Sequence, residues 1–217
     1  MKVNKKYKGL VTKKFNEFYL VELDKDETSV VNKKFLCKIK KSVNFRNQFV
    51  FVGDEVIVYQ IDLQSKRATI ESLVKRNNLL ERPSVANISN IYVICSVEEP
   101  KLNLSQVNKF LISSEQLGVE VSLVLTKCDL ITEEKRLLLI EKFHQWGYQA
   151  ITLNLNNPEN LRTLLIELKK KKCSIFMGPS GVGKTTLLNM IIPGLDNKTA
   201  PVSSKIKRGK NTTRNVE

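Results

Sequence analysis

Hydrophobic and polar residues alternate over short stretches through the first third of the chain. Runs rich in Val, Ile, Phe and Tyr are separated by polar turns. This alternation predicts strands, among them residues 19–22, 35–39 and 55–59. Several short strands within about 70 residues are typical of a small barrel of the OB type. We therefore expect residues 1–73 to form an OB-like β-barrel.

The pattern changes after this region. Residues 74–90 are polar and contain Pro83, which indicates a linker. Residues 91–217 then alternate between apolar runs and helical spacing, which predicts an α/β domain with a mostly parallel sheet. The expected strands are 91–97, 119–125, 150–153 and 173–177. Helices are expected at 105–117 and 161–170, and a further helix is expected from its N-cap Thr132 to about Trp146.

The composition is that of an ordinary folded protein. The chain has 217 residues, of which 41% are hydrophobic and 27% charged. This argues against a disordered chain, a collagen-like chain or a small disulfide scaffold. No apolar run approaches the roughly 18 residues that a membrane helix needs. The basic N-terminus lacks the apolar segment of a signal peptide.

The positive charge lies mainly at the two ends of the chain. The formal net charge is +14, and residues 1–48 carry 13 Lys and Arg against 5 Asp and Glu. Residues 198–217 carry 6 against 1. Such basic regions suit a phosphate backbone, because each neutralised phosphate releases counterions. The alternative interpretation of the charge is an ordinary solvated surface in a Lys- and Asn-rich proteome. The alternative to nucleic-acid binding by the barrel is a purely structural role.

Cysteine and histidine are too dispersed to form a zinc site. The four cysteines are widely spaced without a C-x-x-C pair, and His144 is the only histidine. A structural zinc ion needs clustered Cys and His ligands. We therefore expect no zinc site and a reducing compartment.

The strongest motif is a phosphate loop at residues 178–185. It matches G-x-x-x-x-G-K-[ST] at every fixed position, and it lies between an expected strand and an expected helix. The glycines let backbone N–H groups surround a phosphate, Lys184 would bridge the terminal phosphates, and Thr185 would bind Mg²⁺. The expected nucleotide contacts are Gly178, Pro179, Ser180, Gly181, Val182, Gly183, Lys184, Thr185 and Thr186.

A second motif indicates which base is bound. Thr126, Lys127, Cys128 and Asp129 follow an expected buried strand and resemble the N-K-x-D guanine motif, with Thr in place of Asn. The carboxylate of Asp129 can accept hydrogen bonds from N1–H and the exocyclic amine of guanine, which adenine cannot offer in that arrangement. Lys127 would lie along the base, and Thr126 would join this loop to the phosphate loop.

The two motifs occur in reverse of the usual GTPase order, because Asp129 precedes Gly178 by 49 residues. A parallel sheet tolerates this, since the site forms at strand ends whatever their order along the chain. A β-barrel followed by a circularly permuted P-loop GTPase domain resembles the RsgA/YjeQ family of small ribosomal subunit biogenesis GTPases. Gly53-Asp54, Arg82-Pro83 with Ala86-Asn87, and the two nucleotide motifs stand in the family's order.

This resemblance implies GTP and Mg²⁺ as ligands, GTP hydrolysis stimulated by the small ribosomal subunit, and contact with its rRNA. Gly209-Lys210-Asn211-Thr212-Thr213 resembles the family's switch segment, in which Thr212 or Thr213 would reach Mg²⁺ and the γ-phosphate. Asn211 stands where the family has His, and a basic tail is the alternative. The family's D-x-P-G motif and C-terminal zinc domain do not occur in the sequence. A fragment, a truncated gene product and a divergent short member of the family would each give this pattern.

The leading hypothesis is a monomeric GTP-binding protein that hydrolyses GTP during late maturation of the small subunit, in a bacterial cytoplasm or a plastid stroma. We assign no catalytic base and no membrane partner. A non-catalytic factor that binds rRNA and senses GTP is the first alternative. An ATP-using P-loop enzyme is the second, and the T-K-C-D motif disfavours it.

Overall fold

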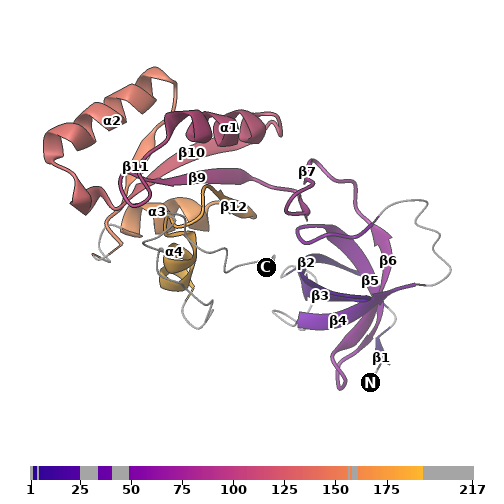
Figure 1. The fold of residues 1–217 in the computed structure, drawn as a ribbon. Helices are drawn as coiled ribbons and strands as arrows, with labels where there is room; N and C mark the ends of the chain where they lie inside the picture. Colours follow the sequence, from indigo (N-terminus) through magenta and orange to yellow (C-terminus); the bar gives the residue numbers. More distant parts are fainter. Residues whose placement is uncertain are drawn as a thin grey trace. The chain divides into compact units, whose positions relative to one another are not determined.

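The computed structural model describes residues 2–3, 5–24, 34–40, 49–155, 157 and 161–192. The chain divides into two compact units, and the division in the described part falls between Ile88 and Ser89. Each unit has its own hydrophobic core. Figure 1 labels the elements of both units.

The first unit is a closed β-barrel of five strands, as the sequence predicted. The strands follow one another in the order β5-β2-β3-β4-β6, and pairing of β6 with β5 closes the barrel. Neighbouring strands are antiparallel except β4 and β6, which are parallel. The strands are β2 Tyr7–Phe15, β3 Phe18–Leu23, β4 Lys34–Ile39, β5 Glu55–Asp62 and β6 Arg67–Leu73, and β1 Lys2–Val3 pairs with β5.

Alternation of side chains along each strand builds the barrel core. In β3, Tyr19, Val21 and Leu23 are buried, whereas the residues between them are partly exposed. Successive side chains of a strand point to opposite faces, so one face of each strand fills the barrel. Phe35 and Cys37 of β4 contribute in the same way, and both are fully buried. This period of two is the signal from which the strands were predicted.

The polar stretch after β6 is held against the barrel by backbone contacts. Two short strands, β7 Leu79–Leu80 and β8 Val85–Ala86, pair with each other. Gly53 approaches β8 so closely that a Cβ at this position would lie 2.1 Å from the Ala86 carbonyl oxygen, and its φ is +87°. A residue with a side chain would therefore clash there and be strained. The side-chain amide of Asn87 also donates to the Gly53 carbonyl at 2.9 Å.

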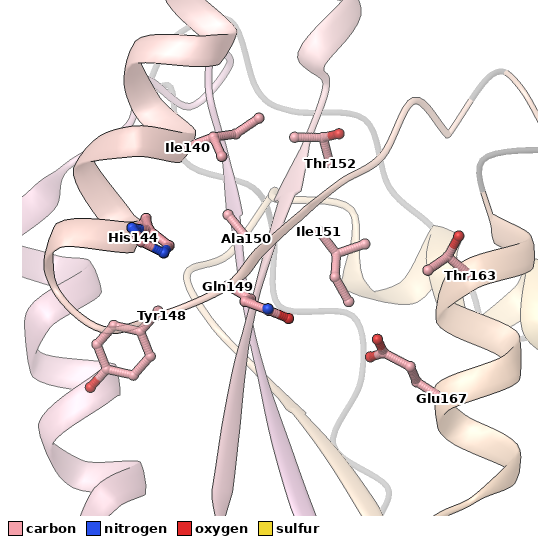
Figure 2. Close-up of a pocket in the computed structure, with 9 residues that line it drawn as sticks. All are labelled: Ile140, His144, Tyr148, Gln149, Ala150, Ile151, Thr152, Thr163 and Glu167. Carbon is pink, nitrogen blue, oxygen red and sulfur yellow. The ribbon is translucent and has the colours of Figure 1, made fainter.

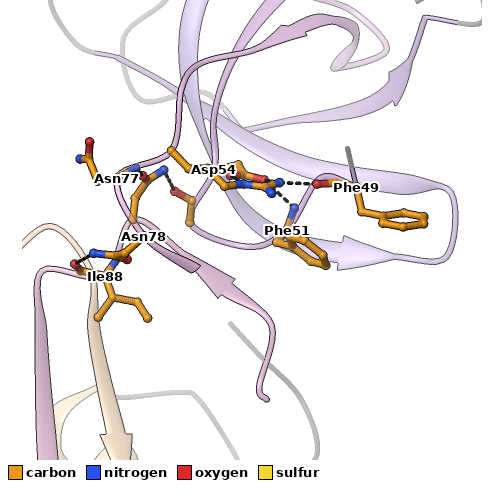
Figure 3. A network of polar contacts seen from close by, with 9 residues as sticks. Phe49, Phe51, Asp54, Asn77, Asn78 and Ile88 are labelled. Atoms are coloured by element: carbon orange, nitrogen blue, oxygen red, sulfur yellow. Dashed lines mark hydrogen bonds and ion pairs between the residues drawn. The ribbon is translucent and has the colours of Figure 1, made fainter. Parts of the chain in front are cut away.

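A buried ion pair joins the same stretch to the turn before β5 (Figure 3). Arg76 donates from Nε to Oδ1 of Asp54 at 2.6 Å and from a terminal nitrogen to Oδ2 at 2.7 Å. The backbone N–H of Phe51 donates to the same Oδ2 at 2.7 Å. The Asp54 side chain is fully buried, and that of Arg76 is 19% exposed. This pairing satisfies a carboxylate that would otherwise be costly to bury.

The second unit is a parallel sheet covered on both faces, as predicted. The strands are β9 Asn90–Ser96, β10 Glu120–Thr126, β11 Ala150–Thr152 and β12 Ser174–Met177, in the order β11-β10-β9-β12. The helices are α1 Leu104–Glu115, α2 Glu133–Gln145, α3 Leu161–Lys169 and α4 Lys184–Ile191. Figure 1 shows α1 and α2 over one face of the sheet and α3 and α4 over the other.

Strand burial and helix starts in this unit follow local sequence signals. Every residue of β9 is buried, which explains its continuous apolar run. Thr132 caps α2 as predicted, because its hydroxyl accepts from the backbone N–H of Lys135 at 3.5 Å. The side chain of Asn103 caps α1 in the same way, at 3.1 Å from the N–H of Gln106. No helix within the described residues is long and apolar enough to cross a membrane.

Candidate functional site

Both predicted nucleotide-binding loops leave the sheet at the same edge. The T-K-C-D segment begins at the last residue of β10, and the phosphate loop follows β12 directly. These two strands flank β9 on either side, and all three are parallel. The carboxyl ends of parallel strands form the crevice in which α/β proteins bind ligands. The topology therefore brings together two motifs that are far apart in the sequence.

The phosphate loop has the backbone conformation that its glycines permit. Gly178, Gly181 and Gly183 have φ values of +148°, +81° and +93°. A Cβ on Gly178 would lie 2.0 Å from the carbonyl oxygen of Ile94 in β9, and one on Gly183 would lie 2.7 Å from Cδ1 of Leu155. Since α4 begins immediately after Gly183, the loop ends at a helix N-terminus, where free N–H groups favour an anion.

Lys184 folds back over this loop. Its ammonium donates to the carbonyl oxygens of Gly178 at 3.0 Å and Pro179 at 2.5 Å. Burial lowers the pKa of the Lys184 ammonium from its ordinary value, because the charged form loses solvation. A phosphate in the loop would stabilise that charge. The Lys184 ammonium thus lies against the backbone at the start of the loop.

The other residues of the loop divide into buried and accessible positions. Val182 is buried, and Leu187 anchors α4 in the core beneath the loop. Ser180, Gly181 and Thr185 are partly exposed, and Thr186 is exposed. Residues at the mouth of the loop therefore remain reachable from solvent, whereas the apolar ones fix its position.

Thr126 joins the two loops, as expected from the sequence. Its hydroxyl donates to the carbonyl oxygen of Val182 at 2.7 Å, across 56 residues of sequence. The hydroxyl also lies 3.4 Å from the carbonyl oxygen of Cys95. The Thr126 side chain is fully buried. A buried hydroxyl with this partner holds the T-K-C-D segment against the phosphate loop.

The remaining residues of the motif present one carboxylate to solvent. Lys127 adopts a left-handed conformation with φ of +57°, and its ammonium donates to the carbonyl of Glu99. Cys128 turns inward, where its thiol donates to the Leu125 carbonyl at 3.3 Å and burial raises its pKa. Asp129 lies in the following 3₁₀ turn and is exposed. This carboxylate can accept the two hydrogen bonds that a guanine edge donates.

Two further loops contribute to this edge of the sheet, and the sequence motifs did not identify them. The loop after β9 provides the Glu99 carbonyl to Lys127, and Ser96 fixes this loop by donating to the Pro100 carbonyl at 2.7 Å. The loop after β11 places Leu155 against Gly183. Both loops follow strands that end at the same edge. The prediction that the strands are parallel was therefore the signal that could have located these loops. The predicted switch residues, Thr212 and Thr213, lie outside the described residues.

A separate cavity of about 480 Å³ lies beside the edge strand β11 (Figure 2). None of the predicted nucleotide-binding residues lines it. Its walls come from α2, β11, the segment that joins them, and α3. The lining residues are Ile140, His144, Tyr148, Gln149, Ala150, Ile151, Thr152, Thr163 and Glu167. In the part of the chain that the structure describes, no three His, Cys, Asp or Glu residues form a group that could hold a metal ion.

Comparison with known proteins gives the family. The sequence model of the RsgA GTPase family matches residues 70–217, which is more than half of the chain. The chain belongs to the RsgA GTPase family. This confirms the resemblance that the barrel, the two motifs and their order had suggested.

Individual relatives cover almost the whole chain. The small ribosomal subunit biogenesis GTPase RsgA of Prochlorococcus marinus strain NATL2A is 38% identical over 98% of this chain and 70% of its own length. The protein of the same name from another strain of Prochlorococcus marinus is 34% identical over 100% of this chain and 74% of its own length. This chain thus spans somewhat less than three quarters of the length of these RsgA proteins.

Solved structures of the RsgA type match the fold. The crystal structure of YjeQ from Thermotoga maritima superimposes with a TM-score of 0.77 and 29% identity, over 90% of this chain and 68% of that one. YloQ, described as a circularly permuted GTPase, gives a TM-score of 0.73 at 24% identity, over 85% and 64% of the two chains. The second likeness shows the fold alone. Together they confirm a barrel followed by a permuted GTPase fold.

Proposed function

We propose that this RsgA-family chain binds GTP with Mg²⁺ and hydrolyses the GTP during late maturation of the small ribosomal subunit. The observation that carries the proposal is the junction of the two loops, where Thr126 donates to Val182 at 2.7 Å. The loop after β12 and the exposed Asp129 after β10 lie at one edge of one sheet, which supports the proposal. A nucleotide that spans both loops would contact them with its phosphates and its base.

The phosphate end of the site fits a nucleotide triphosphate. Backbone N–H groups of residues 178–183, the Lys184 ammonium and the start of α4 would surround the phosphates. Thr185 would hold Mg²⁺ through its hydroxyl, and Thr212 or Thr213 would be a second ligand. Mg²⁺ neutralises charge that develops on the phosphate oxygens during hydrolysis.

The base end of the site favours guanine. Asp129 would accept from N1–H and the exocyclic amine, while the stem of Lys127 lies along the ring. The Glu99 carbonyl supports this role, because it accepts a hydrogen bond from the Lys127 ammonium and so holds this side chain in place. A site built to receive donors rejects an analogue that lacks them by about 10⁴-fold or more.

The small ribosomal subunit is the proposed partner, with the barrel in contact with its rRNA. Relatives over 98% and 100% of the chain are named small ribosomal subunit biogenesis GTPases. The excess of basic residues in 1–48 gives the barrel the charge that a phosphate backbone attracts. The protein would act as a monomer in a bacterial cytoplasm or a plastid stroma, where small subunits mature.

The test is a turnover assay of the purified chain with GTP and with ATP, each with and without small subunits. We expect GTP hydrolysis that small subunits accelerate, and little hydrolysis of ATP. Lys184→Ala should abolish nucleotide binding, because the loop loses its cation. GTP binding without stimulated hydrolysis would leave the non-catalytic GTP-sensing role and exclude the enzymatic one.

A further inference from the structure

One end of the barrel holds aromatic rings and cations that the nucleotide site does not use. Phe49 is 70% exposed and Phe15 is 50% exposed, and these are the two most exposed large aromatic side chains in the described part of the chain. Single exposed apolar residues are common on proteins. The surroundings of Phe49 distinguish it from such cases.

Hydrogen bonds hold the backbone from Phe49 to Phe51. Arg76, which is paired with the buried Asp54, also donates to the Phe49 carbonyl. The N–H of Phe51 is bound to Asp54 at 2.7 Å. Figure 3 shows the Phe49 ring directed away from this network. The ring is therefore presented to solvent by a residue whose backbone is anchored at its carbonyl and at the N–H of Phe51.

Cations surround the neighbouring ring of Phe51. The Arg76 guanidinium lies 4.9 Å from its centroid, and the Lys14 ammonium lies 5.4 Å from it. The centroids of Phe49 and Phe51 are 6.5 Å apart, so the free ring lies next to this cationic group. Asp54 balances the charge of Arg76. Lys14 is exposed and adds positive charge beside the rings.

An exposed aromatic face next to a lysine matches the chemistry of an unpaired nucleotide. The base offers a π-face for stacking, and its phosphate offers a negative charge to the lysine. Bases in a duplex are already stacked on one another and do not offer such a face. An apolar protein segment would fit the ring but would have no use for the cations around it.

We propose that Phe49 is a stacking platform for an unpaired RNA base, with Lys14 as the contact for the adjoining phosphate. Arg76 is a positioning residue, since it holds the Phe49 and Phe51 segment through Asp54 and the Phe49 carbonyl. The inference rests on the proposed function, because it names the surface through which the barrel would bind rRNA.

The experiment measures binding of a fluorescent oligouridylate of about 12 nucleotides, within the range that an OB fold covers, to the full chain by anisotropy. Phe49→Ala should weaken binding by about 5- to 150-fold, the loss expected from one stacked base. Phe49→Leu should lose most of this affinity as well, because it keeps apolar area but removes the π-face. Lys14→Gln should weaken binding and lower its salt dependence by about one ion.

Leu138→Ala is the matched control, since Leu138 is also 70% exposed but lies on α2 in the second unit. It should bind the oligouridylate as the wild type does, and all variants should keep the wild-type affinity for GTP. Wild-type affinity in Phe49→Ala, or stronger binding of a duplex RNA than of the oligouridylate, would overturn the proposal. Retained binding of the oligouridylate in Phe49→Leu would also overturn it, because apolar area without a π-face would then be sufficient.

The proposed function has its own readout in the same set of proteins. Binding of the wild-type chain to small subunits, with stimulated GTP hydrolysis, tests that function directly. If this activity is present while Phe49→Ala binds the oligouridylate normally, the stacking proposal alone fails. If the wild type neither binds small subunits nor responds to them, the proposed function fails.

Discussion

Replacement of Arg76 by Met should destabilise the barrel more than any change at an exposed ion pair. Met keeps most of the apolar stem but removes the guanidinium, which makes two hydrogen bonds of 2.6 and 2.7 Å to Asp54. The Asp54 carboxylate is fully buried, and among the described residues it would keep only the Phe51 N–H as a hydrogen-bond partner. The variant thus leaves a buried charge without its counterion.

The size of the effect follows from that burial. Removal of one partner of a buried ion pair costs about 3–5 kcal/mol, because the remaining charge is desolvated and unpaired. An exposed pair contributes about 0.2–1 kcal/mol. Lys6 and Glu71 form such a pair at 2.7 Å, and the Lys6 side chain is 62% exposed. Lys6→Met therefore serves as the control, with an expected loss below about 1 kcal/mol.

Hydrogen–deuterium exchange in increasing urea, followed by mass spectrometry of peptides from β2 and β5, reports the unfolding free energy of the barrel itself. In a domain of this size, the expected loss corresponds to a fall in Tm of at least about 12 °C. Asp54→Asn combined with Arg76→Met should recover part of the loss, because no unpaired buried charge remains. A loss in Arg76→Met no larger than in Lys6→Met would refute the reasoning.

Three further changes test the site and the cores. Thr126→Val removes the hydroxyl that links the two loops, so we expect about 1 kcal/mol less stability and weaker binding in a fluorescent GTP titration. Gly178→Ala should abolish GTP binding, because the added Cβ would lie 2.0 Å from a carbonyl oxygen of β9. Gly147→Ala is the control, since a Cβ at this position has no other atom within 4 Å. It should cost about 1 kcal/mol of stability and leave GTP binding intact. Burial raises the pKa of the Cys37 and Cys95 thiols to about 12 from 9.0. Between about pH 9 and 12 these two thiols then ionise in the unfolded chain but not in the folded one. They should therefore lower the unfolding free energy across that range, and Cys95→Ala should reduce the slope.

Local periodicity was sufficient to predict most of the fold. The alternation in β3 and the continuous burial of β9 are both visible in the sequence, and these two strands were predicted to within a few residues. The short strands β7 and β8 lie in the stretch that was interpreted as a linker. The capping role of Thr132 was equally readable, because an N-cap depends on neighbours within one turn.

The contacts of residues 74–88 with the barrel could not be predicted in this way. The polarity of this stretch resembles that of a linker, yet Arg76 reaches Asp54 across 22 residues of sequence. Gly53 gave a turn signal, but its close approach to Ala86 depends on a long-range contact. Patterns over short windows contain no information about such pairs.

The site itself was predicted motif by motif rather than as a whole. The phosphate loop and the T-K-C-D segment each have a local signature, and their meeting follows from the parallel order of β10, β9 and β12. The supporting contacts from Glu99 and Leu155 have no signature, because a backbone carbonyl and an apolar side chain can serve in almost any sequence. Only the folded chain reveals them.

Guanine recognition through Asp129 is the central claim, and a competition titration tests it most directly. A fluorescent GTP analogue bound to the full chain would be displaced with GTP and with ATP, for the wild type and for Asp129→Asn. The account predicts that GTP displaces the analogue from the wild type at concentrations about 10⁴-fold below those of ATP. In Asp129→Asn, binding of GTP should weaken and the preference should shrink. Equal displacement by ATP and GTP from the wild type would contradict the account.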